Sequence, residues 1–404
     1  MAGPEPSPSP KILLAKPGLV TGAPLTGKFT RGGATEDDST QLRSRLPSVA
    51  SLNLLSDSWD FHFDRFLPFL TENTDFTVIG VIGSPGVGKS TIMNELYGFD
   101  STSPGMLPPF TIQSEENRAM ARHCSIGIEP RISSERIILL DTQPVFSASV
   151  LSEMMRPDGS STISVLSRES LSAELAHELM GIQLAVFLAS VCHILLVVSE
   201  GVDDDSMWHL MSTLLQCLAS PFADILVDLL KHDISDPSLL ASSLSHNSSS
   251  GHDNNNKVPE CEYMATPVFV HTKLQDQELT SKNCLKLKKA LMQYFKPSSF
   301  VRENTGNKPS EENHLDSDTL NLFTIPFKKK EENPRAQHES YISALWKLRD
   351  QILAMKSPSF RRPVSEREWL KNSAKIWEQL DQLGPWLAPA GAFATMTMGA
   401  MFIY

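Results

Sequence analysis

Eight consecutive residues carry the clearest chemistry in this sequence. Residues 83–90 read GSPGVGKS and match the pattern G-x-x-x-x-G-K-[ST] at every fixed position. In this pattern the glycines let successive backbone N–H groups point at phosphate oxygens, the lysine neutralises the outer phosphates, and the serine hydroxyl reaches Mg²⁺. We therefore expect a purine nucleotide, GTP/GDP or ATP/ADP, bound together with Mg²⁺. The predicted phosphate-binding residues are Gly83, Ser84, Gly86, Val87, Gly88, Lys89, Ser90 and Thr91.

An acidic residue ends a second apolar run further along the chain. Asp141 closes the stretch IILLD at residues 137–141, where a nucleotide-binding fold of this kind places the acid that holds Mg²⁺ through a water. Ser125, in HCSIGIEP at residues 123–130, is a candidate counterpart of the threonine that contacts the metal in signalling GTPases. The predicted metal-side residues are therefore Ser90, Asp141 and Ser125.

The residues after Asp141 argue against efficient hydrolysis. Signalling GTPases continue this acid as Asp-x-x-Gly, and the glycine N–H bonds the γ-phosphate. Here the fourth residue is Pro144, which has no N–H to donate. Val145 stands where a water-orienting glutamine is expected, and Gln143 precedes the proline. We predict no catalytic residues and a chain that is not an enzyme, or one that hydrolyses nucleotide only weakly.

Recognition of the base is only partly encoded. Guanine-specific proteins carry Asn/Thr-Lys-x-Asp after a late strand, and this chain reads VHTKLQD at residues 270–276. Thr272 and Lys273 match and are the predicted base-binding residues. Gln275 takes the place of the aspartate, and Asp276 lies one residue late. The choice between guanine and adenine therefore stays open. A second alternative also stays open, in which this strand-end loop is polar but binds no base.

Charge and cysteine content narrow the environment of the protein. The 404-residue chain has a formal net charge of -11, and its only notable basic run is KKK at residues 328–330, so nucleic acid is not expected as a direct ligand. Five scattered cysteines form no C-x-x-C pair, which is typical of reduced thiols in the cytoplasm and also in the nucleus. The neighbours His123–Cys124 and Cys192–His193 are expected to pack as ordinary residues rather than bind zinc.

Apolar runs alternate with helical stretches along the chain. Runs that are apolar on both faces, with helices between them, predict an α/β, doubly wound, mostly parallel sheet of the P-loop NTPase, G-domain-like class. The aromatic stretch at residues 57–70 suggests a helix or helix-like clasp. Expected strands cover residues 76–83, 136–140, 192–198, 267–271 and 321–327, and expected helices cover residues 89–97, 171–189, 206–217, 281–295 and 340–356.

Composition also predicts the boundaries of the domain. Residues 1–50 are rich in Pro, Gly, Ser and Thr and are expected to form a disordered arm. Residues 51–358 form the G-like domain, with polar insertions near 242–257 and 302–314. A C-terminal helix at 359–384 begins with Ser365 and Glu368 in a capping-box spacing. Residues 385–404 are an uncharged tail of weak hydropathy, so membrane association is not expected.

Several of these motifs together resemble one known family. GSPGVGKS, RIILLDTQPVFSASVL, LAVFLASVCHILLVV, NLFTIPF and EWLKNSAKIW are similar to the SMG-nine family, with LDTQP the most specific motif. The resemblance covers about residues 50–380. It implies the smaller G-fold-like subunit that accompanies a phosphatidylinositol-3-kinase-like protein kinase in nonsense-mediated mRNA decay. The positions that match the family's phosphate site are Gly83, Gly86, Gly88, Lys89, Ser90 and Asp141.

The resemblance implies a regulatory function. Such a subunit pairs with a larger G-fold-like partner, docks on the kinase and restrains its activity toward an RNA helicase. Two alternatives remain open from the residues themselves. The intact phosphate loop is compatible with an active GTPase or ATPase switch, and the uncharged C-terminal tail is compatible with a membrane-associated P-loop protein.

Overall fold

The fold was analysed in a computed structural model of the chain. It describes residues 52–56, 58–99, 107–120, 122–155, 172–218, 263–295, 320–329, 339–355, 359–360 and 362–382. The predicted arm at 1–50, the insertions near 242–257 and 302–314 and the tail at 385–404 lie outside these residues. Described residues fall within one compact unit, Ser51–Tyr404.

A six-stranded sheet forms the centre of the protein, in the order β2-β3-β1-β4-β5-β6. Neighbouring strands run parallel except β2, which pairs antiparallel with β3 at one edge. The predicted α/β, doubly wound, mostly parallel fold is therefore confirmed. The strands are β1 (Thr77–Gly83), β2 (Ile128–Ile132), β3 (Ile137–Thr142), β4 (Ile194–Glu200), β5 (Thr266–Leu274) and β6 (Leu322–Pro326).

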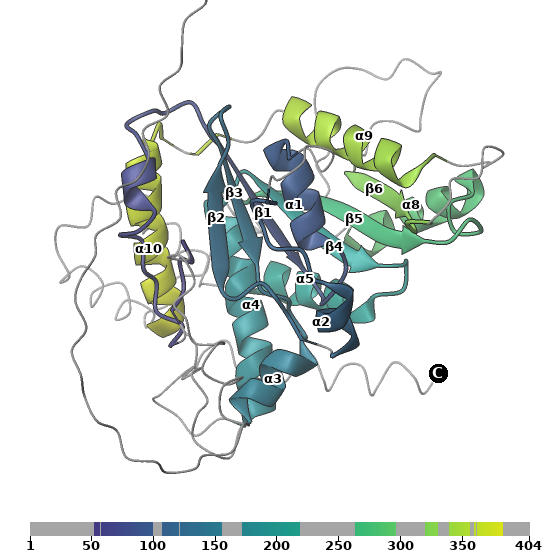
Figure 1. Ribbon diagram of the computed structural model, residues 1–404, viewed down its shortest axis with the longest axis horizontal. Helices are drawn as coiled ribbons and strands as arrows, with labels where there is room; N and C mark the ends of the chain where they lie inside the picture. Colours follow the sequence, from purple (N-terminus) through teal and green to yellow (C-terminus); the bar gives the residue numbers. More distant parts are fainter. Residues whose placement is uncertain are drawn as a thin grey trace, which may run out of the picture. The chain divides into compact units, whose positions relative to one another are not determined.

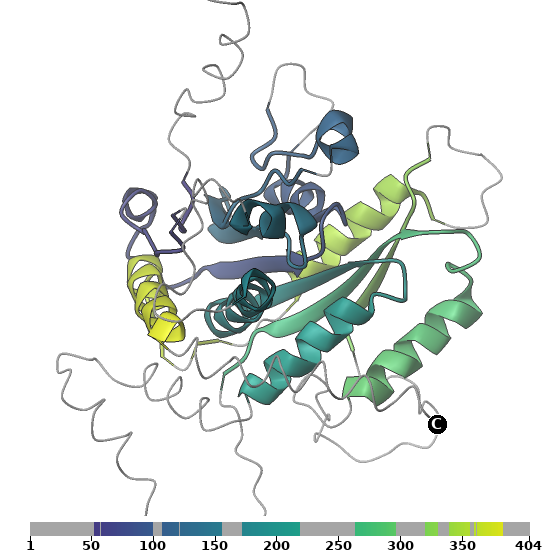
Figure 2. The same cartoon turned by 90° about the horizontal axis from the view of Figure 1, so that it is seen from below.

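Helices cover both faces of the sheet (Figure 1). Helices α1 and α9 pack over one face around Ile92 and Leu348, and helices α4, α5 and α8 pack over the other (Figure 2). Because both faces are buried, the central strands β1, β3 and β4 are apolar along nearly their whole length. The helices are α1 (Lys89–Tyr97), α2 (Glu115–Ala119), α3 (Ala148–Met154), α4 (Ala173–Val191), α5 (Asp205–Leu218), α8 (Ser281–Phe295), α9 (Tyr341–Ala354) and α10 (Glu366–Gln382).

The long elements lie where the sequence predicted them, but three short ones were missed. Strand β2 was missed because Pro130 and the charged residues Glu129 and Arg131 interrupt its apolar pattern, which an edge strand tolerates. Helices α2 and α3 have only 5 and 7 residues, too few to establish a helical period. All three lie between β1 and α4 in sequence, in the region that surrounds the phosphate loop.

The helix suggested for residues 57–70 is wrong. The segment is irregular, with a bridge between Leu55 and Phe61 and one 3-10 turn, η2 (Leu67–Phe69). Phe61 and Phe63 are half-buried while His62 between them is exposed, an alternation with the period of an extended chain. The expected packing is present, because the rings of Phe61 and Phe187 lie 5.7 Å apart in an edge contact.

Helix α10 is fastened to this irregular segment and to α4. The Trp377 indole N–H donates to the Trp59 carbonyl at 3.0 Å, and the Trp369 indole N–H donates to the Val191 carbonyl at 2.8 Å. The predicted cap is partly confirmed, since Ser365 Oγ accepts from the Glu368 N–H at 3.3 Å. The Glu368 carboxylate binds Arg362 at 2.8 Å instead of returning to the cap.

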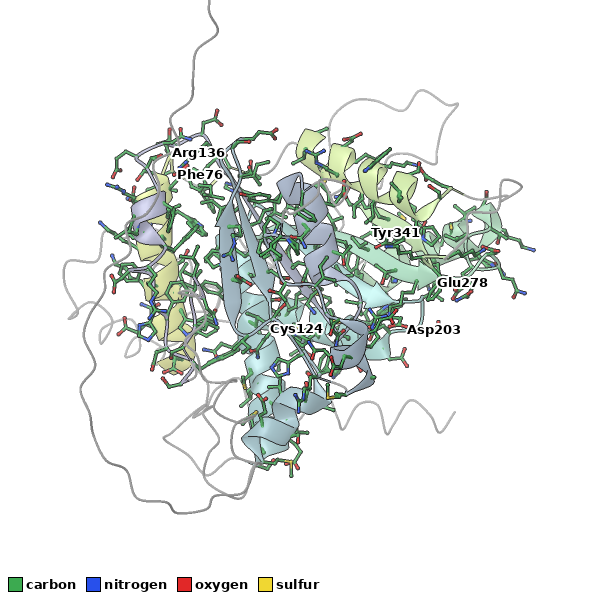
Figure 3. The ribbon with its side chains drawn as sticks, viewed as in Figure 1. Phe76, Cys124, Arg136, Asp203, Glu278 and Tyr341 are labelled. Atoms are coloured by element: carbon green, nitrogen blue, oxygen red, sulfur yellow. The ribbon has the colours of Figure 1, made fainter. Side chains whose placement is uncertain are left out.

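A fully buried carboxylate locks the start of α10. Glu366 is 0% exposed and accepts hydrogen bonds from Arg136 Nε at 2.6 Å and from the Thr71 N–H at 2.7 Å. A second Arg136 nitrogen and the Thr71 hydroxyl also donate to it. Figure 3 shows Arg136 near one end of α10. One side chain thus joins β3, the segment before β1 and the C-terminal helix.

Helix α4 is the one described helix whose length and composition would suit a membrane span. Its mean hydropathy is 1.3, and 78% of the span is buried inside the protein. The burial explains the hydropathy, because α4 packs against the sheet, α5 and α10 and offers little surface to any solvent.

We expect Glu366→Ala to lower the free energy of unfolding by about 2 kcal/mol, because the hydrogen bonds to a fully buried carboxylate are lost, while Arg136, 31% exposed, stays partly solvated. Glu368→Ala is the matched control. Its pair with Arg362 has side chains 42% and 44% exposed, and exposed pairs contribute less than about 1 kcal/mol. Urea denaturation of both variants measures the difference. Equal losses would show that Glu366 does not hold α10.

Candidate nucleotide site

The phosphate loop connects β1 to α1, and close packing requires glycine at its start. A Cβ on Gly83 would lie 2.1 Å from the Val198 carbonyl oxygen of β4, so no larger residue fits there. Gly88 is the N-cap of α1 with φ 100°, a conformation that L side chains rarely adopt. The close packing at Gly83 and the positive φ at Gly88 allow a sharp turn from β1 into α1. The backbone N–H groups at the start of α1 are thereby directed toward the loop.

Lys89 begins α1 and folds back across the loop. Its ammonium donates to the Gly83 carbonyl at 2.9 Å and the Ser84 carbonyl at 3.0 Å. Burial lowers the pKa of Lys89 to about 8, and the nearby carboxylate of Asp141 opposes this shift. The lysine is therefore mostly charged at neutral pH and can bind an anion. Its pKa lies closer to neutral pH than that of an exposed lysine.

The three predicted metal-side residues converge at the ends of β3 and the loop. Asp141 Oδ2 accepts from Ser90 Oγ at 2.8 Å and from Ser125 Oγ at 3.0 Å, and the two hydroxyls lie 3.3 Å apart. Burial raises the pKa of Asp141, while Lys89 and the two serines draw it back down. Residues distant in sequence thus form one oxygen-rich cluster beside Lys89.

This cluster fits a hard divalent cation. Mg²⁺ prefers oxygen ligands, and the cluster supplies two hydroxyls and a carboxylate. Asp141 Oδ1 is buried and has no hydrogen-bond partner among the described residues, which is costly for a carboxylate oxygen unless a water or ion meets it. The chemistry of these donors therefore agrees with the Mg²⁺ predicted from the sequence.

Residues 143–145, which follow Asp141, make contacts within the protein or lack a donor. Pro144 lines the pocket beside the loop and cannot donate. Val145 is buried and its N–H donates to the Gly83 carbonyl at 3.2 Å. The Gln143 side chain is also buried, with its carbonyl oxygen accepting from the Gly127 N–H at 3.0 Å. This hydrogen bond joins Gln143, just after β3, to Gly127, just before β2.

The predicted base-binding residues lie at the end of β5, but their side chains are engaged by the protein. The Thr272 hydroxyl donates to the Val87 carbonyl at 2.8 Å and is also 3.1 Å from the Ser199 carbonyl. Lys273 pairs with Glu200 at 2.5 Å, and Asp276 pairs with Lys329 at 2.8 Å. Thr272 therefore positions the phosphate loop, and a contact of Thr272 or Lys273 with a base stays a prediction.

The pocket also contains residues that the sequence reasoning did not assign to it. The segment before Ser125 forms a second wall, opposite the phosphate loop. It was missed because no fixed motif marks it; the only signal was a set of polar and cationic side chains close to Ser125. The pocket is lined by Pro85, Gly86, Gly88, Lys89, Ser90, Thr91, Thr111, Ile112, Gln113, Arg118, His123, Cys124, Ser125 and Pro144.

His123 belongs to this wall and is tied to α3. Its Nδ1 lies 2.7 Å from Ser149 Oγ, and its Nε2 lies 3.9 Å from Glu153. Burial lowers the pKa of His123, so its ring is predominantly neutral at pH 7. No group of three or more His, Cys, Asp or Glu side chains suited to a metal occurs among the described residues, and this includes the neighbourhoods of Cys124 and Cys192.

Comparisons with known proteins agree with the motif analysis. No family model matches the chain. It is 26% identical over 340 residues to the nonsense-mediated mRNA decay factor SMG9 of Xenopus tropicalis, which covers 78% of this chain and 61% of that protein. The SMG9 of Salmo salar is 25% identical over 354 residues, covering 81% and 64%. The SMG9 of Caenorhabditis elegans is 32% identical over 183 residues, or 44% of each chain.

Among solved structures, the chain is similar to a septin GTPase domain from Chlamydomonas reinhardtii, which covers 79% of this chain and 98% of that one. The sequence identity is 8% and the TM-score 0.27, a likeness too small to support any conclusion. This chain spans about three fifths of the length of the vertebrate relatives it matches. The matching motifs and the extent of the alignments identify it as a homologue of the SMG9 nonsense-mediated mRNA decay factors, which confirms the family that the sequence predicted.

Proposed function

We propose that this chain is a nucleotide-binding regulatory subunit that acts in nonsense-mediated mRNA decay. The observation that carries the nucleotide site is the convergence of Ser90, Ser125 and Asp141 beside Lys89. Ser90, Ser125 and Asp141 would hold Mg²⁺, which would neutralise phosphate charge when bound. The loop amides would cradle the phosphates, Lys89 would pair with the outer ones, and the serine hydroxyls would orient the cation.

We further propose that the site binds nucleotide without efficient turnover. Hydrolysis needs a water held in line with the terminal phosphate and a donor that follows the developing charge. The side chains of Gln143 and Val145 are both buried in contacts within the protein, and Pro144 lacks an N–H. The same residues oppose the alternative of an active switch. The alternative of a membrane-associated protein rests on residues 385–404, which lie outside the described residues.

The wider role proposed here comes from the relatives, whose names place them in nonsense-mediated mRNA decay. We propose that the chain pairs with a larger G-fold-like subunit and restrains a phosphatidylinositol-3-kinase-like kinase. The proposed compartment is the cytoplasm, with the nucleus as a second site. Neither nucleic acid nor a membrane is proposed as a direct partner, in keeping with the net charge of -11.

Nucleotide binding should take up protons at alkaline pH. Because the pKa of Lys89 is about 8 and bound phosphate should raise it, affinity should fall as pH rises through 8. Binding should therefore take up a larger fraction of a proton at pH 8.5 than at pH 7. Calorimetric titration in two buffers of different ionisation enthalpy measures this uptake.

Two variants of the 404-residue chain complete this test. Lys89→Met should weaken nucleotide binding and remove the ligand-dependent rise in melting temperature. Lys329→Met, at an exposed lysine paired with Asp276, should change neither. Binding without proton uptake would contradict the role of Lys89. No binding of guanine or adenine nucleotides by the unmodified chain would overturn the nucleotide site itself.

Turnover by the unmodified chain should lie well below the rate of about 1 s⁻¹ at which ordinary enzymes begin. Pro144→Gly should not create a good enzyme. It restores one donor, worth about 3 to 4 kcal/mol at best, but no positioned water. Phosphate release under single-turnover conditions is the measurement, with Lys89→Ala controlling for contaminants. Turnover above about 1 s⁻¹ that disappears in Lys89→Ala would show an active enzyme.

Kinase restraint can be tested with purified components. Adding this chain together with the larger G-fold-like subunit should lower the initial rate at which the kinase phosphorylates its helicase substrate. The larger subunit alone, at the same concentration, is the control, and size-exclusion chromatography establishes that the complex forms. An unchanged rate in the assembled complex would refute restraint, while failure to assemble would refute the proposed partners.

A further inference from the structure

One cationic side chain of the pocket has no function in the site described above. Arg118 lies on α2, and its side chain lines the same pocket as Lys89, Ser90, Ser125 and Pro144. Lys89 and Arg118 are the lysine and the arginine among the described residues that line this pocket. A phosphate chain would therefore meet one cation from the loop and one from the opposite wall.

The wall that carries Arg118 is held in place by its own hydrogen bonds. Ser114 caps α2 by accepting from the Asn117 N–H at 3.1 Å. The Asn117 amide contacts Cys124 Sγ at 3.4 Å, and the Gln113 amide donates to the Arg122 carbonyl at 2.7 Å. These contacts connect α2 to the segment that ends at Ser125. Figure 3 shows Cys124 close to α2 near the centre of the molecule.

The guanidinium of Arg118 is available to a ligand. The residue is exposed, and it forms no ion pair or side-chain hydrogen bond with the part of the chain described by the structure. Glu115 and Glu116 lie on the same helix, yet neither forms an ion pair with it among the described residues. An unpaired arginine at a phosphate pocket can donate two parallel hydrogen bonds to one phosphate group.

Near Pro144 the pocket lacks a backbone N–H donor for the terminal phosphate. Arg118 could supply that donor instead. Where Asp-x-x-Gly would present a backbone N–H to the terminal phosphate, Pro144 presents none. In the proposed site Lys89 would pair with the outer phosphates, and Ser90, Ser125 and Asp141 would hold the cation. A third phosphate adds negative charge that the loop alone does not match. Arg118 is the remaining charged group able to meet it.

We propose that Arg118 binds the terminal phosphate and makes this site prefer a nucleoside triphosphate over the diphosphate. The inference rests on the nucleotide site proposed above and assigns it a ligand class. Arg118 acts here as a specificity-determining residue and not as a catalytic one, because the residues at 143–145 position no water. Hydrogen bonds connect α2 to the residues just before Ser125. Binding of the third phosphate to Arg118 would therefore stabilise this wall of the pocket next to the phosphate loop.

The test compares Arg118→Ala with Arg122→Ala in the 404-residue chain. Arg122 is exposed, lies four residues away and does not line the pocket, so it is a matched control. Isothermal titration with Mg²⁺ measures Kd for a β,γ-imido triphosphate and for the diphosphate of the same base, with guanine and with adenine. Thermal melts without nucleotide establish that both variants fold, as expected for changes at exposed side chains.

Arg118→Ala should weaken triphosphate binding about tenfold or more, the loss expected for a hydrogen bond to a charged group. It should change diphosphate binding less than about twofold, and Arg122→Ala should change neither. Equal weakening of both ligands would show a general electrostatic effect and overturn the inference. No change in either ligand would also overturn it, yet leave the nucleotide site standing. Absence of binding to the unmodified chain would overturn both proposals.

Discussion

The opposite charges of Lys89 and Asp141, both buried at the phosphate loop, are the constraint on which the site depends. Away from water each charge is disfavoured, so burial lowers the pKa of the lysine and raises that of the aspartate. Their mutual attraction, the loop carbonyls and the two serine hydroxyls offset this cost. One carboxylate oxygen remains without a partner among the described residues. A magnesium nucleotide would supply the missing contacts, which explains why we expect binding and stability to rise together.

The rest of the fold keeps these two charges at a fixed separation. Asp141 lies in β3, and Lys89 follows the loop after β1. These two strands are adjacent and parallel, and their register pairs Thr77 with Ile137. Gly83 allows β1 to end against β4 without a side chain between them. At the other end of the sheet, Glu366 joins α10 to Arg136 at the start of β3. The C-terminal helix therefore supports the same strand whose far end carries the site acid.

The proposed function makes this site a nucleotide sensor rather than an enzyme. Binding energy from the loop, the metal cluster and the proposed Arg118 contact is directed at the phosphates in their ground state. In the proposed function, Gln143 accepts from the Gly127 N–H and Pro144 has no N–H, so neither is assigned a role in the transition state. The wall formed by α2 would then report whether a third phosphate is bound.

The sequence by itself determined the phosphate loop, the long elements and the family, because each is a local pattern of residue types. The loop needs glycine, lysine and serine at set spacings, and buried parallel strands need continuous apolar runs. Tertiary structure alone decided the rest. Ser125 meets Asp141 only because β2 folds antiparallel beside β3, and Arg118 reaches the pocket only through the short helix α2. Residues 58–64 alternate between exposed and more buried side chains like an extended chain, and this segment packs on α10 where local aromatic content suggested a helix. Short elements and long-range contacts of this kind depend on partners distant in sequence, so no local pattern specifies them.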